Sequence, residues 1–303
     1  MEFGKLETKK DINFELSATP AFYKNNLKNY NQKEKFLFIG GTGWAMPEWI
    51  GKWYPKGTKS KTFLKEYANQ FSAIECNTTF YRMPSLELIS SWKSKVPNDF
   101  KFCIKLYNGI SRSTDFGESD QLFDNFVQSI ERLDENLGCF FLQFPNNFDY
   151  ASSTKLEQWL EDKSLKKNLF FEFRHQSWFD SFKKDSKFLD FLKSKKIGIV
   201  ITDVAGRRDV MHQYLTTDTV MIRFVATEDE IIDEKRLKDW SLKIIEWFNA
   251  GLGEVYFFMH SFDSDYVPKL VKIFIGKMEG YNLKNKLQIP TFFGKEPNQL
   301  SLF

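Results

Sequence analysis

Charged side chains stand at the ends of several short apolar runs in this 303-residue chain, and their types suit acid–base and phosphate chemistry. The carboxylates in such positions are Glu75, Glu172 and Asp203. The cations in such positions are Lys105, Arg174 and Arg223. Carboxylates move protons or supply oxygen ligands to Mg²⁺ or Mn²⁺, and cations hold a phosphate or a developing oxyanion. We therefore predict a catalytic group of Glu75, Glu172, Asp203 and Lys105. The three carboxylates are candidate ligands for a divalent metal, unless the basic residues satisfy them instead.

Further polar and aromatic residues close to the same strand ends are candidate contacts for a substrate or its phosphate. They are Trp44, Asn77, Tyr81, Gln143, Arg174, Arg223 and His260. Because side chains alternate along a strand, Glu75 and Asn77 share one face, which we expect to be the interior. Trp44 lies in an aromatic loop that could form a wall for a sugar or base, or could simply pack against the protein.

The elements that must position these residues alternate along the chain from residue 35 onward. Apolar runs expected as strands cover residues 36–40, 73–77, 100–106, 139–144, 169–173, 197–203, 220–225 and 255–259. Amphipathic segments expected as helices cover residues 61–70, 86–95, 121–136, 154–161, 187–195, 234–249 and 266–278. About eight such units in roughly 250 residues fit an α/β fold of the closed (β/α)8 type, a TIM barrel, better than an open doubly wound sheet. Barrel enzymes build their sites at the C-terminal strand ends, where the charged residues stand.

The two ends of the chain differ from this alternating region. Residues 1–34 are rich in Lys, Asn and Glu without a sustained period, which predicts a peripheral N-terminal extension. Residues 285–303 read as a C-terminal tail, and residues 35–284 as one barrel domain.

Composition excludes several classes of protein. No apolar run approaches the roughly 20 residues of a membrane span, and no signal peptide is visible, so a cytoplasmic protein is expected. Three scattered Cys and three His favour neither a disulfide framework nor a His-rich metal cluster. The glycines at 40, 41 and 43 do not have the dinucleotide-binding spacing, so no nicotinamide cofactor is expected. A net charge of +3 does not by itself indicate nucleic-acid binding.

A non-catalytic alternative exists for the charged strand ends. Three acids and three bases could form only a buried ion-pair network that fixes the barrel. Removing one partner from such a network costs about 3–5 kcal/mol, whereas the intact network adds little net stability. Since charged residues are rarely buried without a purpose and these converge on one mouth, we favour a functional site.

Several composite motifs resemble the YecE-like family, known as domain of unknown function 72. They are GGTGW at 40–44, ECNTTFYRMP at 75–84, QFP at 143–145 and EFRHQSW at 172–178. The resemblance covers about residues 36–278 and implies a barrel of the TIM type. It implies no settled reaction.

The last five residues, Gln299, Leu300, Ser301, Leu302 and Phe303, resemble the bacterial sliding-clamp-binding motif. Such a peptide buries its Leu and Phe side chains in a preformed apolar pocket while the Gln hydrogen-bonds at the rim. The resemblance implies that Gln299, Leu300, Leu302 and Phe303 contact the DNA sliding clamp, with DNA as a further partner.

Three functions are compatible with these observations. The first is an enzyme, a hydrolase or lyase, that acts on DNA or a nucleotide-like phosphorylated substrate while tethered to the clamp. The second is a metabolic enzyme for a small sugar phosphate. The third is a non-catalytic clamp-associated binding protein whose charged mouth is structural.

Overall fold

The structure is a computed structural model that describes residues 12–20, 27–28, 30, 32–112, 117–161, 163 and 168–294. Its strands are β1 (Phe36–Gly40), β2 (Ala73–Cys76), β3 (Lys101–Lys105), β4 (Leu137–Gln143), β5 (Asn168–Glu172), β6 (Ile197–Ile199), β7 (Ile201–Asp203), β8 (Thr219–Val225) and β9 (Glu254–His260). They form two sheets, ordered β2-β3-β4-β5-β6 and β1-β9-β8-β7, in which every pairing is parallel.

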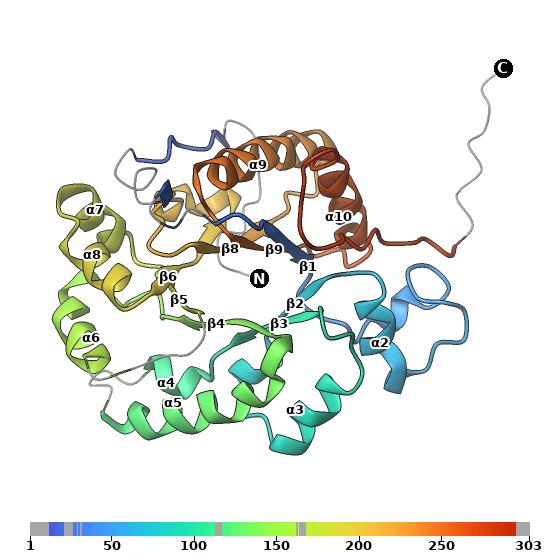
Figure 1. Ribbon diagram of the computed structural model, residues 1–303, viewed down its shortest axis with the longest axis horizontal. Coiled ribbons are helices and arrows are strands. Elements are labelled where there is room, and N and C mark those ends of the chain that lie inside the picture. The colour runs from blue at the N-terminus through green and yellow to red at the C-terminus, as the bar shows by residue number, and fades with distance from the viewer. Residues whose placement is uncertain are drawn as a thin grey trace.

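The two sheets meet at both of their edges. Strands β6 and β7 are separated only by Val200, whose N–H donates to the Phe171 carbonyl at 2.9 Å. Strands β1 and β2 are joined by backbone hydrogen bonds from Ser72 to Ile39 (3.2 Å) and from Glu75 to Gly41 (3.0 Å). The strands therefore follow one another around a ring, and the predicted α/β fold of the TIM-barrel type is confirmed (Figure 1).

A glycine permits the close approach of β1 and β2. A Cβ at Gly40 would lie 1.8 Å from the carbonyl oxygen of Ala73, which no side chain could tolerate without moving the backbone. The sequence therefore fixes this contact through a residue that has no side chain.

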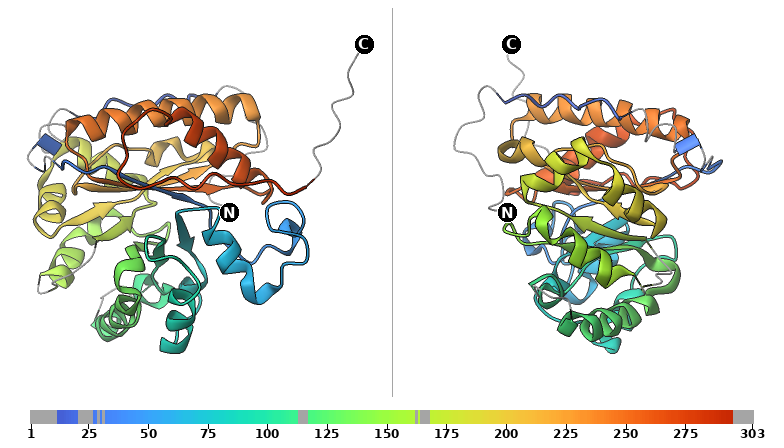
Figure 2. Two further views of the ribbon diagram at one scale, coloured as in Figure 1. Left: turned by 45° about the vertical axis from the view of Figure 1, so that its right-hand side comes forward. Right: turned by 90° about the vertical axis from the view of Figure 1, so that its left-hand side faces the viewer.

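Helices cover the outside of the strand ring. They are α2 (Phe63–Ala68), α3 (Leu86–Lys93), α4 (Asn108–Arg112), α5 (Gly117–Ile130), α6 (Ser153–Leu160), α7 (Gln176–Lys184), α8 (Lys187–Ser194), α9 (Glu230–Ala250) and α10 (Tyr266–Lys277). Figure 2 shows α9 and α10 on the opposite side of the barrel from α3 and α5. The longest of the described helices, α9, begins where the Asp229 side chain accepts the Ile232 N–H and ends at Gly251, which has a φ of 119°.

The core has two layers that follow the alternation of the strands. Residues that face the barrel interior form one cluster: Phe38, Ala73, Cys103, Cys139, Phe141, Phe170, Val200, Met221, Tyr256 and Phe258. Their neighbours along each strand, such as Phe171 beside Phe170, join the larger cluster against the helices. The polar residues of the candidate site, described below, occupy the next interior-facing positions of these strands, closer to the C-terminal strand ends.

Both terminal regions contact the barrel within the part that is described. Thr19, in the predicted N-terminal extension, is buried and accepts a hydrogen bond from Trp247 of α9 at 2.7 Å. Asn285 hydrogen-bonds both the N–H and the carbonyl of Leu37, and the Phe292 ring lies 5.0 Å from that of Trp53. The first ten residues of the predicted tail therefore run along the barrel.

The clamp-binding residues Gln299, Leu300, Leu302 and Phe303 lie outside the described residues. Within the described part of the chain, no helix is both long enough and apolar enough to cross a membrane.

Candidate active site

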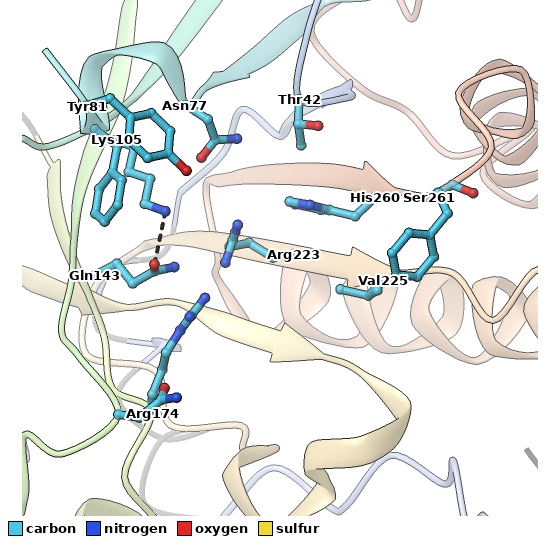
Figure 3. Close-up of a pocket in the computed structure, with 13 residues that line it drawn as sticks. Thr42, Asn77, Tyr81, Lys105, Gln143, Arg174, Arg223, Val225, His260 and Ser261 are labelled. Carbon is cyan, nitrogen blue, oxygen red and sulfur yellow. Dashed lines mark hydrogen bonds between the residues drawn. The ribbon is translucent and has the colours of Figure 1, made fainter. Parts of the chain in front are cut away.

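A cavity of about 610 Å³ opens at the C-terminal ends of the strands (Figure 3). Its lining consists of Thr42, Asn77, Phe80, Tyr81, Lys105, Gln143, Asn146, Arg174, Arg223, Val225, His260, Ser261 and Phe262. These residues come from the ends of β1, β2, β3, β4, β5, β8 and β9, or from the loops that follow them. Six of the seven residues predicted as substrate contacts line this cavity, and the exception is Trp44.

Arg223 of β8 lies between two glutamates at the floor of the site. Its Nε and Nη2 donate to Glu75 of β2, each at 2.9 Å, and its Nη1 donates to both oxygens of Glu172 of β5 at 2.9 Å. All three side chains are at most 1% exposed. One guanidinium thus satisfies two buried carboxylates, which could not remain ionised there without it.

Other donors complete the coordination of the two carboxylates. Glu75 also accepts from Asn77 at 2.8 Å and from the His260 Nε2 at 3.1 Å. Glu172 also accepts from Gln143 (2.7 Å), Arg174 (3.1 Å) and Thr202 (3.3 Å). The oxygens of both glutamates are therefore engaged by the protein itself.

These contacts determine the protonation state of Glu75 and Glu172. Burial alone would raise the pKa of Glu75, but Arg223 and His260 outweigh it and hold that pKa well below its ordinary value. The pKa of Glu172 is likewise lowered to about 2, because Arg174 and Arg223 outweigh the effect of burial. Two glutamates that stay ionised and fully hydrogen-bonded at neutral pH act as anchors for the cations above them, and neither has a proton to donate.

His260 belongs to the same anchoring layer. Burial is the largest influence on its pKa, which is lowered despite the neighbouring Glu75 carboxylate. Since Glu75 is ionised and can only accept, the neutral imidazole must carry its proton on the Nε2 that faces it.

Lys105 of β3 differs from the other cations of the mouth. Its Nζ donates to the Gln143 Oε1 at 2.9 Å and lies 3.9 Å from the centroid of the Phe80 ring, and the side chain is buried. Among the described residues, no carboxylate lies within ion-pair distance of it. Burial, with repulsion from Arg223, lowers the pKa of Lys105 to about 8.

The chemical character of the cavity follows from its lining. Three cations, Lys105, Arg174 and Arg223, share it with the amides of Asn77, Gln143 and Asn146, and no Asp or Glu of the described residues lines it. Glu75 and Glu172 lie beneath the two arginines, where they hold them in place without lining the cavity. An anion is the natural occupant of such a surface.

The prediction that Asp203 faces the mouth is wrong. Its carboxylate lies against the helix layer, where it accepts from Trp240 Nε1 at 2.8 Å and pairs with Arg236 at 3.0 Å and with Arg208. Thr202, one residue earlier, is the side chain that turns inward to Glu172. Asp203 shares its parity with Ile201, and that apolar face is the one covered by helices.

The predicted metal triad is not formed. Nowhere in the described residues do three His, Cys, Asp or Glu side chains come close enough together to hold a metal ion. Glu75 and Glu172 do converge, but the Arg223 guanidinium lies between them and uses the oxygens that a cation would need. A divalent metal does not fit this donor set.

Trp44 also lies elsewhere. Its ring packs edge-on against Trp92 at 5.4 Å and contacts the helix-side core, so the packing alternative describes it. The aromatic residues that do line the cavity are Phe80, Tyr81 and Phe262. Tyr81 was predicted, and Phe80 stands beside it in the same motif, whereas nothing in the sequence singled out Phe262.

Comparison with known proteins agrees with this architecture. A family model described as "Protein of unknown function DUF72" matches residues 38–291, which is most of the chain. The chain belongs to this family. The resemblance inferred from the motifs is thereby confirmed, and the match includes every residue of the cavity lining.

Relatives of the DUF72 family include proteins known by sequence and by structure. "UPF0759 protein YecE" from Escherichia coli, strains K12 and O157:H7, is 26% identical over 253 residues, covering 78% of this chain and 90% of the relative. Two structures of a DUF72 family protein from Enterococcus faecalis V583 superpose with TM-scores of 0.63 and 0.57 at 21% and 19% identity. They cover 84% and 81% of this chain and 99% and 96% of theirs. At that identity the likeness shows the fold, and the function must be argued from the site.

Proposed function

We propose that the protein is an enzyme whose barrel mouth binds a small phosphorylated substrate, either a sugar phosphate or a nucleotide-like molecule. The observation that carries the proposal is the lining of the cavity, to which the described part of the chain contributes three cations and three amides but no carboxylate. A volume of about 610 Å³ is within the range of small-molecule sites. The exposed Tyr81 and Phe262 at the rim give a sugar or base ring a surface to stack on.

The roles within the site follow from the contacts. Arg174 and Lys105 hold the phosphate, and Lys105 is the group able to exchange a proton near neutral pH, because its pKa is about 8. Glu172 holds Arg174 in position from below and is itself fixed by Arg223, whereas Gln143 holds Lys105. Asn77, Gln143 and His260 are the polar contacts that orient the substrate.

Titration calorimetry with a ligand panel tests this proposal. The panel compares ribose 5-phosphate and a nucleoside monophosphate with unphosphorylated ribose. We expect the phosphorylated ligands to bind about tenfold or more tightly than ribose, because charge-assisted hydrogen bonds to phosphate account for such a difference. Lys105→Met should lower their affinity by a similar factor.

Lys187→Met is the matched control, since Lys187 is a lysine whose side chain is 88% exposed and which does not line the cavity. Equal affinity for ribose and its phosphate, or equal losses in both variants, would refute the phosphate site and leave the ion-pair network as the only role of the mouth.

We also propose that the protein associates with the DNA sliding clamp through its last five residues, which would place the barrel at DNA. This proposal rests on the sequence of residues 299–303 alone. A peptide ending in these residues and the full chain should both bind the purified clamp, and deletion of residues 299–303 should abolish binding by the full chain. Binding that survives the deletion, or no binding by either, would overturn it.

A further inference from the structure

Lys105 is chemically unusual among the buried cations of this protein. Arg223 and Arg236, which are as deeply buried, each contact a carboxylate at 2.9 Å. Lys105 is 8% exposed, and no carboxylate of the described residues pairs with it. Its ammonium contacts one amide oxygen, that of Gln143, and one aromatic face, that of Phe80. The fold therefore buries an amine that forms no ion pair with the described carboxylates, and this amine points into the cavity.

The surroundings of Lys105 favour the neutral amine. Burial lowers the pKa of Lys105 most, repulsion from Arg223 and Arg174 lowers it further, and the attraction of Glu172 and Glu75 only partly compensates. With a pKa lowered to about 8, a far larger share of the amine is unprotonated at neutral pH than in an ordinary lysine. An unprotonated lysine in a buried, cation-flanked site is the form that attacks carbonyl carbon.

We infer that Lys105 is a nucleophile that forms a Schiff base with the carbonyl group of a sugar phosphate whose phosphate is held beside it by Arg174. This inference rests on the proposed function, because the phosphate must bind in the same cavity. It narrows the substrate to phosphorylated aldoses or ketoses in their open-chain form, and it makes Lys105 a catalytic residue.

The step balances without any further reagent. The Lys105 nitrogen adds its electron pair to the carbonyl carbon, and one proton moves from that nitrogen to the carbonyl oxygen to give a neutral carbinolamine. A proton from the solvent then lets this oxygen leave as water, and the nitrogen electron pair forms the protonated carbon–nitrogen double bond. The net change is amine plus carbonyl plus one proton to iminium plus water. The iminium withdraws electrons from the adjacent carbon, which is what a lyase acting on a sugar requires.

Two sources could supply this carbonyl group. One is a free sugar phosphate, and the other is the open-chain sugar at an abasic site in DNA, which carries an aldehyde next to phosphates. Both present the same chemistry to Lys105 and Arg174, so the experiment must separate them. A cavity of about 610 Å³ has the size of a small-molecule site, which favours the free sugar phosphate.

Borohydride trapping tests the inference with the full chain. Hydride reduces an iminium to a stable secondary amine, so the protein is incubated with substoichiometric glyceraldehyde 3-phosphate and sodium borohydride and then mapped by peptide mass spectrometry. We expect the Lys105 peptide to carry at least tenfold more label than any other lysine peptide. With unphosphorylated glyceraldehyde, the Lys105 peptide should carry no more label than the other lysine peptides. In a parallel arm, an oligonucleotide with one abasic site should give no covalent complex if the free sugar phosphate is the substrate.

Two variants separate nucleophilic attack from binding. Lys105→Arg keeps a cation but has no nucleophilic amine, so it should retain binding of glycerol 3-phosphate, which has no carbonyl, and lose trapping. Lys187→Met should trap as the wild-type chain does. The circular dichroism and thermal midpoint of each variant show whether it is folded.

The outcomes distinguish the two proposals. If glycerol 3-phosphate binds but Lys105 is labelled no more than other lysines, the Schiff base is refuted and the phosphate site stands. If glycerol 3-phosphate does not bind and Lys105 is not preferentially labelled, the proposed function fails and this inference fails with it. Trapping of the abasic oligonucleotide on Lys105, without trapping of the free sugar phosphate, would overturn the assignment of the source.

Discussion

Arg223 and Glu75 are 148 residues apart in the sequence and are joined by two hydrogen bonds of 2.9 Å inside the barrel. The same guanidinium holds Glu172 from the other side. This bridge connects β2, β5 and β8, so it ties together strands that are not neighbours in the ring. It is both the floor of the cavity and a cross-link of the fold.

Loss of the bridge should be costly. Arg223→Met leaves two buried carboxylates without their main partner, and we expect the free energy of unfolding to fall by about 3–5 kcal/mol. Urea denaturation measures this change. Lys235→Met is the control, because it removes a cation from an exposed pair with Asp239 and should cost at most about 0.5 kcal/mol. A loss below about 1 kcal/mol for Arg223→Met would contradict the anchoring role.

The carboxylates should make the stability depend on acid pH. The pKa of Glu172 is lowered from 4.5 to about 2 in the folded state, so its contribution to stability is full above pH 4.5 and is lost as the pH falls toward 2. The wild-type chain should therefore lose stability more steeply between pH 4.5 and 2 than Glu172→Gln does. Denaturant unfolding at a series of pH values measures the two slopes, and parallel slopes would show that Glu172 is not held ionised.

Lys105 should make the stability rise with pH at alkaline pH as well. Its pKa is lowered from 10.5 to about 8 in the folded state, so between these values the unfolded chain binds the proton more strongly. The stability of the wild-type chain relative to Lys105→Met should therefore rise with pH from about 8 to 10.5. Both chains contain the same tyrosines, which also titrate at alkaline pH. The difference between the two unfolding free energies, measured across this range, therefore reports the titration of Lys105. A constant difference would refute the lowered pKa.

The contact between β1 and β2 should depend on Gly40. Gly40→Ala would place a methyl group 1.8 Å from the Ala73 carbonyl oxygen, so we expect a large loss of stability or failure to fold. Gly276→Ala in α10 meets nothing within 4 Å and should raise the free energy of unfolding by about 0.4–1 kcal/mol. Thermal unfolding of the two variants tests both expected changes in stability. A Gly40→Ala chain as stable as the wild type would show that β1 and β2 can separate.

Much of the site could be predicted because strand alternation is a local property. The inward parity of Glu75, Lys105, Glu172 and Arg223 follows from single strands, and their common position at the C-terminal ends follows from the parallel order. The same rule contained the answer for Asp203. In residues 197–203 the bulky Ile side chains mark the helix-facing parity, which Asp203 shares, and Thr202 belongs to the other.

The sequence by itself determined the strand positions, the inward set of polar residues and the family. Only the tertiary structure decided how the charges are distributed. It places Arg223 where both glutamates reach it and pairs Asp203 with Arg236. It leaves Lys105 without a carboxylate partner among the described residues. The physical reason is that ion pairing depends on distances across the barrel between strands far apart in the chain, and burial then sets the protonation of each group. Composition shows that acids and bases balance, but only the three-dimensional arrangement determines which cation is left without an acid.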